Sequence, residues 1–167
     1  MPHPRELCEE EVVVRLRNVE TGRPLFVDGD DMTASCKFED CGDDEHCHFK
    51  VVKADDGFFF ICMAFGHPLF MCDDMTVRVM EEGGAEAWFV AEEAGDDVRP
   101  RGFEPPNRHR HVCPRSPPST APCRSQCYNL MCCGRDEMPM MCDGDDLVAR
   151  GMQERESPLA KWFIEPV

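Results

Sequence analysis

Three stretches of this chain repeat one pattern, and the repeat limits the possible folds more than any other feature. The pattern is a proline, three apolar residues, an acidic turn and a further apolar residue. The copies begin at Pro24, Pro68 and Pro139 and read PLFVDGDDMT, PLFMCDDMT and PMMCDGDDL. Chance is a poor explanation for three such matches. The chain is therefore predicted to contain three copies of one supersecondary unit.

Each copy has strand-like runs on both sides. Apolar runs at 12–16, 58–65 and 127–133 precede the copies, and the run 75–79 that follows the second copy alternates apolar and polar residues. Each unit then closes on an aromatic pattern, at 48–51, 87–90 and 161–164. We therefore expect about four short strands per unit, joined by Gly, Pro and Asp turns, and no helix.

Twelve strands in three units must share one core, because a single unit cannot bury its apolar face alone. The compact closed arrangement is an all-β fold, the β-trefoil, in which a barrel is capped by three hairpins and closure protects the strand edges. A β-sandwich with accidental internal similarity is the alternative. In a trefoil, two sets of equivalent core positions are predicted, Phe49 with Trp88 and Trp162, and Leu25 with Leu69 and Met140.

The predicted organisation is a single domain over 1–167, with repeats at about 11–54, 58–93 and 125–167. Pro24 and Pro68 lie 44 residues apart, whereas Pro68 and Pro139 lie 71 residues apart. The longer spacing places an insertion at about 94–124. From Arg99 to Arg124 it holds seven of the 14 prolines, six of the 18 Lys and Arg residues and one acid. Such a segment is predicted to be a mobile loop. It is a tolerated insertion, or else a basic arm or a processing site.

The formal net charge is −15, from 18 basic and 33 acidic residues. A surface this acidic repels phosphate backbones and anionic membranes, so we expect neither nucleic-acid binding nor membrane insertion. The first 14 residues lack the basic start and the apolar stretch of a signal peptide. Without a signal, most of the 12 cysteines are expected to be reduced, with no pairing assigned, and Cys36, Cys62 and Cys132 to be small buried side chains.

Catalytic and metal-binding motifs are missing from the sequence. The spacing of Cys41, Cys47 and His48 is not that of a zinc site. The acidic clusters at 28–31 and 143–146 lack the EF-hand pattern and recur with the repeat, which favours hairpin turns over calcium loops. We therefore expect no enzyme, no cofactor and no metal, and a function carried by surface loops on a rigid frame.

Several segments, taken in order, resemble the interleukin-1 family of cytokines. Residues 15–19 followed by 25–27 resemble the family's first hairpin, and 68–72 followed by 76–81 resemble its central LxLSC…PTLxLE pattern. Near the C-terminus, 123–125, 130–132 and 136–140 resemble the family signature and the E-N-M-P-V that follows it, and 162–167 match its closing aromatic strand. The signature is about two residues short here, and its Pro and Trp are missing.

This resemblance implies an extracellular, monomeric ligand for an interleukin-1-receptor-family ectodomain built of immunoglobulin-like domains. It would be an agonist or antagonist in inflammatory and immune signalling, made in the cytoplasm and secreted without a signal peptide. The family's first-hairpin contacts, carried over to this chain, point to Arg17 and Thr21, with Glu20 and Arg23 beside them. The alternative for these four is an ordinary exposed strand and turn.

Two other binding functions fit a trefoil. A protease inhibitor would use the segment from Arg99 to Arg124 as its reactive loop, since arginines suit a trypsin-like pocket. A lectin would need a sugar-stacking aromatic and an Asp in each repeat, outside the core.

Overall fold

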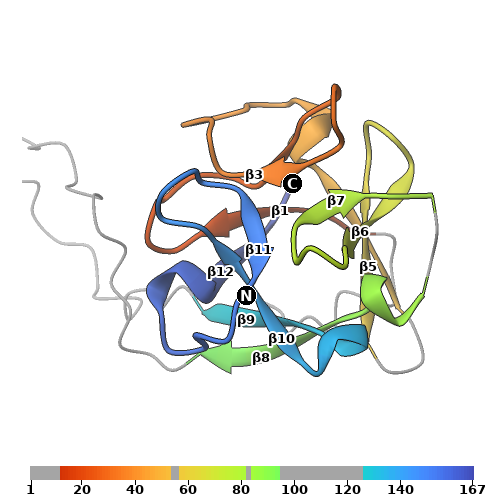
Figure 1. Cartoon of the computed structure of the whole chain (residues 1–167). Helices are drawn as coiled ribbons and strands as arrows, with labels where there is room; N and C mark the ends of the chain where they lie inside the picture. Colours follow the sequence, from red (N-terminus) through yellow and green to blue (C-terminus); the bar gives the residue numbers. More distant parts are fainter. Residues whose placement is uncertain (1–11, 54–56, 82–83, 95–125) are drawn as a thin grey trace, which may run out of the picture.

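The computed structural model describes residues 12–53, 57–81, 84–94 and 126–167. These residues form twelve strands (Figure 1), namely β1 (Val13–Asn18), β2 (Phe26–Val27), β3 (Ala34–Ser35), β4 (Phe49–Lys53), β5 (Phe58–Cys62), β6 (His67–Met71), β7 (Val77–Val79), β8 (Phe89–Ala94), β9 (Cys127–Cys132), β10 (Met138–Cys142), β11 (Ala149–Gly151) and β12 (Lys161–Pro166). Single-turn 3₁₀ segments lie between them, namely η2 (Glu45–Cys47), η3 (Ala85–Ala87), η4 (Cys133–Arg135) and η5 (Pro158–Ala160). None of the described helical segments has the length and apolar character needed to span a membrane.

Six of the strands close into an antiparallel barrel. The pairs run β1–β4, β4–β5, β5–β8, β8–β9 and β9–β12, and β12 returns to β1 with Leu16 opposite Ile164. Figure 1 shows the first strand, in red, and the last, in blue, side by side, as this closure requires. The barrel confirms the predicted all-β fold and leaves none of its six strands with an open edge.

Three hairpins stand at one end of the barrel, formed by β2–β3, β6–β7 and β10–β11. One backbone hydrogen bond joins each hairpin to the next: Cys36 N–H to Leu147 O (2.8 Å), Val79 N–H to Met32 O (2.9 Å) and Gly151 N–H to Met75 O (2.7 Å). The three accepting residues share a left-handed backbone, with φ between 59° and 65°. This ring of bonds makes the three hairpins one cap, which is the β-trefoil arrangement.

The acidic clusters form the hairpin turns, as their recurrence predicted. Asp31, Asp74 and Asp146 each accept a hydrogen bond from the backbone N–H two residues further on, at 2.9–3.0 Å. These bonds hold the turns in which the left-handed residues lie. They also lower the pKa of all three carboxyl groups, with the bond to Thr76 Oγ1 as the largest cause at Asp74.

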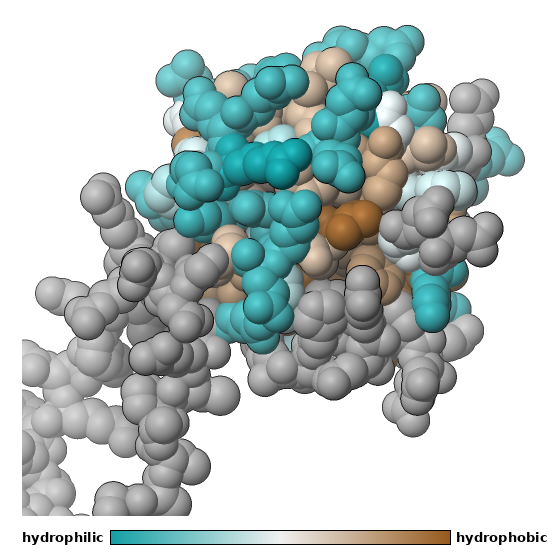
Figure 2. Space-filling view, turned by 90° about the horizontal axis from the view of Figure 1, so that it is seen from below, coloured by the Kyte–Doolittle hydropathy of each residue, from teal (hydrophilic) through white to brown (hydrophobic). Residues whose placement is uncertain are grey.

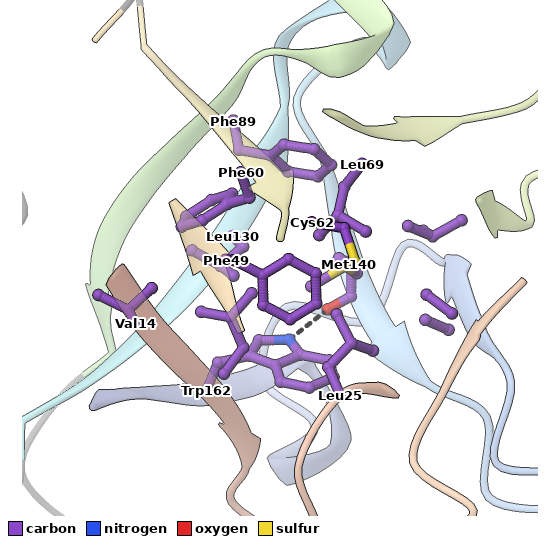
Figure 3. Packing of buried hydrophobic residues seen from close by; sticks show 14 of the residues in the cluster. Val14, Leu25, Phe49, Phe60, Cys62, Leu69, Phe89, Leu130, Met140 and Trp162 are labelled. Carbon is purple, nitrogen blue, oxygen red and sulfur yellow. Dashed lines mark hydrogen bonds between the residues drawn. The ribbon is translucent and has the colours of Figure 1, made fainter. Parts of the chain in front are cut away.

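The core fills the barrel and the space beneath the cap. Leu25, Leu69 and Met140 are all fully buried, which confirms the set predicted from the repeat. Figure 3 shows them around the ring of Phe49 and the indole of Trp162, whose Nε1–H donates to Met140 O at 2.8 Å.

Trp88 is not the third member of the aromatic core set. Phe89 holds that position and is fully buried, whereas Trp88 is only partly buried. In each repeat the residue directly after the 3₁₀ segment caps its end, and the next residue points into the barrel, as Phe49, Phe89 and Trp162 do. The prediction was wrong by one residue because period-two alternation does not show which of two adjacent aromatic residues faces inward.

The predicted insertion at about 94–124 lies outside the described residues except for Ala94, which ends β8. The repeat boundaries therefore stay predictions. In the space-filling view of Figure 2, hydrophilic residues cover most of the described face and apolar residues gather near its middle.

Candidate functional site

The loop between β1 and β2 holds three of the four residues that the sequence resemblance singled out, because Arg17 lies in β1 next to the loop. It is a tight turn in which Gly22 N–H donates to Asn18 O and Asn18 N–H donates to Arg23 O, both at 2.9 Å. Gly22 has φ +66°, and a Cβ there would have open space around it, so a side chain is disfavoured by the backbone conformation alone.

Asn18 fixes this loop from beneath. Its side chain is fully buried, and its Nδ2 donates to Leu159 O at 2.8 Å. Its Oδ1 accepts from the backbone N–H groups of Glu20 (3.2 Å) and Thr21 (3.1 Å). One buried amide therefore ties the loop to η5, and the loop's shape is set before any partner arrives.

The side chains of the four predicted residues differ in how many of their polar atoms are already bonded within the chain. Arg17 lies back against β12, with its Nε 3.2 Å from Glu165 and its Nη1 donating to Gly22 O at 2.8 Å. Thr21 Oγ1 accepts from Arg23 N–H at 3.2 Å and so shapes the turn. Glu20 lies on the same turn. The structure thus brings the four residues together, but the side chains of Arg17 and Thr21 already make hydrogen bonds within the chain.

Beside this loop lies an aromatic cluster that the sequence analysis did not identify. The centroids of the Phe26 and Phe38 rings are 4.4 Å apart, and those of Phe26 and His46, which are stacked, are 5.3 Å apart. The Phe65 ring meets His46 edge-on at 5.2 Å. Phe38 is 47% exposed, and the other three are partly buried. These four residues are called the aromatic cluster below.

Local chemistry holds His46 in the cluster. Asp44 caps η2, its Oδ1 accepting from His46 N–H at 3.0 Å and lying 2.6 Å from His46 Nδ1. The backbone bond is the largest cause of the lowered pKa of the Asp44 carboxyl. A disulfide between Cys41 and Cys47, which the sequence analysis did not assign, closes this segment. Both sulfurs are used in that bond, so they are not zinc ligands.

Arg23 joins the loop and the aromatic cluster into one surface. Its Nη1 donates to Lys37 O at 3.1 Å, and its Nη2 lies 3.6 Å from Glu39. Lys37 and Glu39 flank Phe38 in the sequence, so the guanidinium anchors the segment that carries the exposed ring. We call the combined surface the loop–aromatic face, made up of Glu20, Thr21, Arg23, Phe26, Phe38, His46 and Phe65.

Two buried thiols, Cys62 and Cys132, do not have the properties of a nucleophile. Burial raises the pKa of Cys132 to about 11 and is also the main cause of the raised pKa of Cys62. Both stay protonated near neutral pH, and only the thiolate is strongly nucleophilic. Among the described residues, no three His, Cys, Asp or Glu side chains gather as a metal site.

Comparison with known proteins supports the fold. No protein-family model and no curated protein sequence matches this chain. Among solved structures, a designed three-fold symmetric protein, ThreeFoil, matches with a TM-score of 0.65 and 11% identity over 93% of this chain and 99% of its own.

Two larger proteins also match over 93% of this chain. A Clostridium perfringens endo-β-galactosidase that releases GlcNAcα1-4Gal has a TM-score of 0.67 and 11% identity, and a mosquitocidal holotoxin has 0.68 and 6%. The chain corresponds to only 32% of the first and 16% of the second. At these identities the likeness shows a β-trefoil-like fold alone.

Proposed function

We propose that this chain is a non-enzymatic, secreted ligand that binds an interleukin-1-receptor-family ectodomain through the loop–aromatic face. The observation that carries the proposal is the continuity of that face: the loop selected by the family resemblance adjoins an exposed aromatic cluster, and Arg23 links the two. Aromatic residues and arginine are enriched in protein interfaces and among the few residues that dominate their binding energy.

The rigidity of the face supports the same proposal. Asn18 holds the loop from beneath, and the Cys41–Cys47 disulfide holds the segment that presents His46. A surface ordered before binding loses less conformational entropy when a partner docks. The net charge of −15 would steer the chain toward a basic receptor surface.

Biolayer interferometry with the full chain and a panel of interleukin-1-receptor-family ectodomains tests this function. We expect sub-micromolar binding to one receptor and at least tenfold weaker binding by Phe38→Ala, since truncating a hot-spot side chain costs about 2 kcal/mol or more. Phe70→Ala is the control for removing a partly exposed phenylalanine outside the face, because Phe70 occupies in β6 the place that Phe26, a member of the aromatic cluster, has in β2. Binding of no receptor would refute the proposal, and equal losses in both variants would refute the assigned face. A reporter-cell assay then separates agonist from antagonist.

A saccharide is the second candidate ligand, because the aromatic cluster also offers ring faces beside the Asp44 carboxylate. Aromatic rings stack on the apolar faces of sugars, and carboxylates accept bonds from hydroxyl groups. A glycan array tests it: glycan binding that Phe38→Ala abolishes, without receptor binding, would favour a lectin. The inhibitor alternative depends on residues 99–124, which lie outside the described ranges, and trypsin inhibition assays test it directly.

A further inference from the structure

Two buried cysteines from different hairpins meet inside the cap. Cys36 directly follows β3 and Cys142 ends β10, and both side chains are fully buried. Their thiols hydrogen-bond to each other. Both residues also reach the backbone oxygen of Leu147: the Cys36 N–H donates to it at 2.8 Å, and the Cys142 Sγ lies 3.7 Å from it. Nothing in the proposed function uses this pair.

The three-fold repeat of the cap gives the same pairing. Cys36, Val79 and Gly151 donate the three backbone bonds that join one hairpin to the next. At Gly151, an added Cβ would run into the Sδ of Met71, the last residue of β6. Cys142 is the last residue of β10, so Cys36 faces at its own junction the position that Met71 holds at the other. The contact between the two thiols therefore follows from how the hairpins join.

The surroundings of the pair favour a covalent bond between the two sulfurs. Cysteines whose side chains point apart cannot be bridged without backbone movement, whereas these two point at each other. The chain already holds one disulfide, Cys41–Cys47, and disulfides persist under oxidising conditions. Under the conditions that preserve that bond, two free thiols in contact are the next to be oxidised.

We propose that Cys36 and Cys142 are oxidised to a second disulfide that links the β2–β3 hairpin to the β10–β11 hairpin. One thiolate attacks a small-molecule disulfide of the oxidised-glutathione class and releases one thiol, and the second cysteine then displaces the other. The protein loses two protons and two electrons, and the reagent leaves as two thiols. The hydrogen bond to Cys142 and burial raise the pKa of the Cys36 thiol in the folded chain, so the exchange takes place before the cap closes.

The second disulfide would fix one end of the segment that carries the exposed ring of Phe38. Cys36 lies two residues before Phe38, and Cys41, which is already bonded to Cys47, lies three residues after it. One end of the segment would be linked to the β10–β11 hairpin and the other to η2. This bond forms whichever partner the loop–aromatic face binds.

Disulfide mapping of the full chain tests this bond. The reduced, unfolded protein is refolded over a series of glutathione ratios, trapped with N-ethylmaleimide in guanidinium chloride and digested for peptide mass spectrometry. We expect the Cys36–Cys142 cross-linked peptide in more than half of the molecules at the most oxidising ratio. Cys62 and Cys132 are the buried controls, since their thiols donate to backbone oxygens at 3.8 and 3.3 Å, and should be at least tenfold less oxidised. If Cys36 and Cys142 are alkylated at every ratio, or are cross-linked mainly to other cysteines, the proposal is overturned.

A double variant, Cys36→Val with Cys142→Val, separates the cross-link from packing. It places at this junction the two residue types that Val27 and Val79 supply at an equivalent one. We expect the oxidised parent chain to melt at least about 5 °C above the oxidised double variant, because a bond that closes a long loop restricts the unfolded chain. In a reducing buffer the two should melt within about 2 °C of each other. Equal Tm values for the two oxidised proteins would overturn the link between the hairpins, and the mapping decides the question if the double variant fails to fold.

Discussion

Replacing Asn18 by alanine removes a buried side chain that joins the β1–β2 loop to η5. Three well-formed hydrogen bonds are lost, to Leu159 O at 2.8 Å and from the N–H groups of Glu20 and Thr21 at 3.2 and 3.1 Å. Each contributes about 1 kcal/mol net, so the free energy of unfolding should fall by about 3 kcal/mol. For a chain of this size, that lowers Tm by roughly 6–12 °C.

Thermal unfolding followed by far-UV circular dichroism measures this change, and hydrogen exchange at the amides of Glu20 and Thr21 reports the loop itself. Thr21→Ala is the matched control, since it removes one acceptor on the same turn and should lower the stability by only about 1 kcal/mol. Asn18→Asp keeps the acceptor but turns a carboxylate oxygen toward Leu159 O, so at pH 7 it should be at least as damaging as alanine. A Tm shift below about 3 °C for Asn18→Ala would refute the idea that this amide positions the loop.

Three further predictions concern the core, a close backbone contact and the turns. Trp162→Phe should lower the free energy of unfolding by about 2–3 kcal/mol, measured by urea unfolding, because it leaves Met140 O without its hydrogen-bond donor and creates a void. Trp88→Phe should change that free energy by less than about 0.5 kcal/mol, since the Trp88 Nε1 has no hydrogen-bond partner among the described residues. Gly134→Ala should lower Tm strongly, because a Cβ there would overlap the backbone of η3 at Ala85. The lowered pKa values of the turn carboxyls mean that their stabilisation is present above their unfolded pKa of about 4 and is lost as the pH falls below it; replacing them by Asn should flatten the acid limb of a Tm–pH profile. The three carboxyls concerned are Asp31, Asp74 and Asp146.

Each of these three predictions has a result that would contradict it. Equal effects of the two tryptophan substitutions would restore Trp88 to the core. A Gly134→Ala protein with parental Tm would show that η3 and η4 can move apart. An unchanged acid limb after the Asn replacements would show that the turns contribute no pH dependence to folding.

The twelve strands and the shared core were predictable because they follow from periodicity within short segments. The repeat places Leu25, Leu69 and Met140 at corresponding positions, and all three are buried in the structure. The acidic turns were predictable for the same reason, since Asp side chains bond to backbone groups two residues away. The exchange of Trp88 for Phe89 shows the limit of this reasoning, because the turn of η3 decides which of the two rings faces inward.

The candidate site also has features that the sequence predicted and features that it did not. Arg17, Glu20, Thr21 and Arg23 lie within a stretch of seven residues, so their proximity could be anticipated from the sequence. The ion pair that turns Arg17 back onto Glu165 spans almost the whole chain and could not be anticipated. The one local signal of the aromatic cluster was Phe26, which lies between the buried Leu25 and Val27 and so faces outward.

The sequence by itself therefore determined an all-β chain of repeated hairpins with acidic turns and a common core, since each of these depends on patterns only a few residues long. Only the tertiary structure decided which rings meet on the surface and which cysteines pair. Phe26, Phe38, His46 and Phe65 belong to separate segments of the chain. Contacts of this kind depend on how the barrel closes and how its loops pack, which no local pattern in the chain encodes.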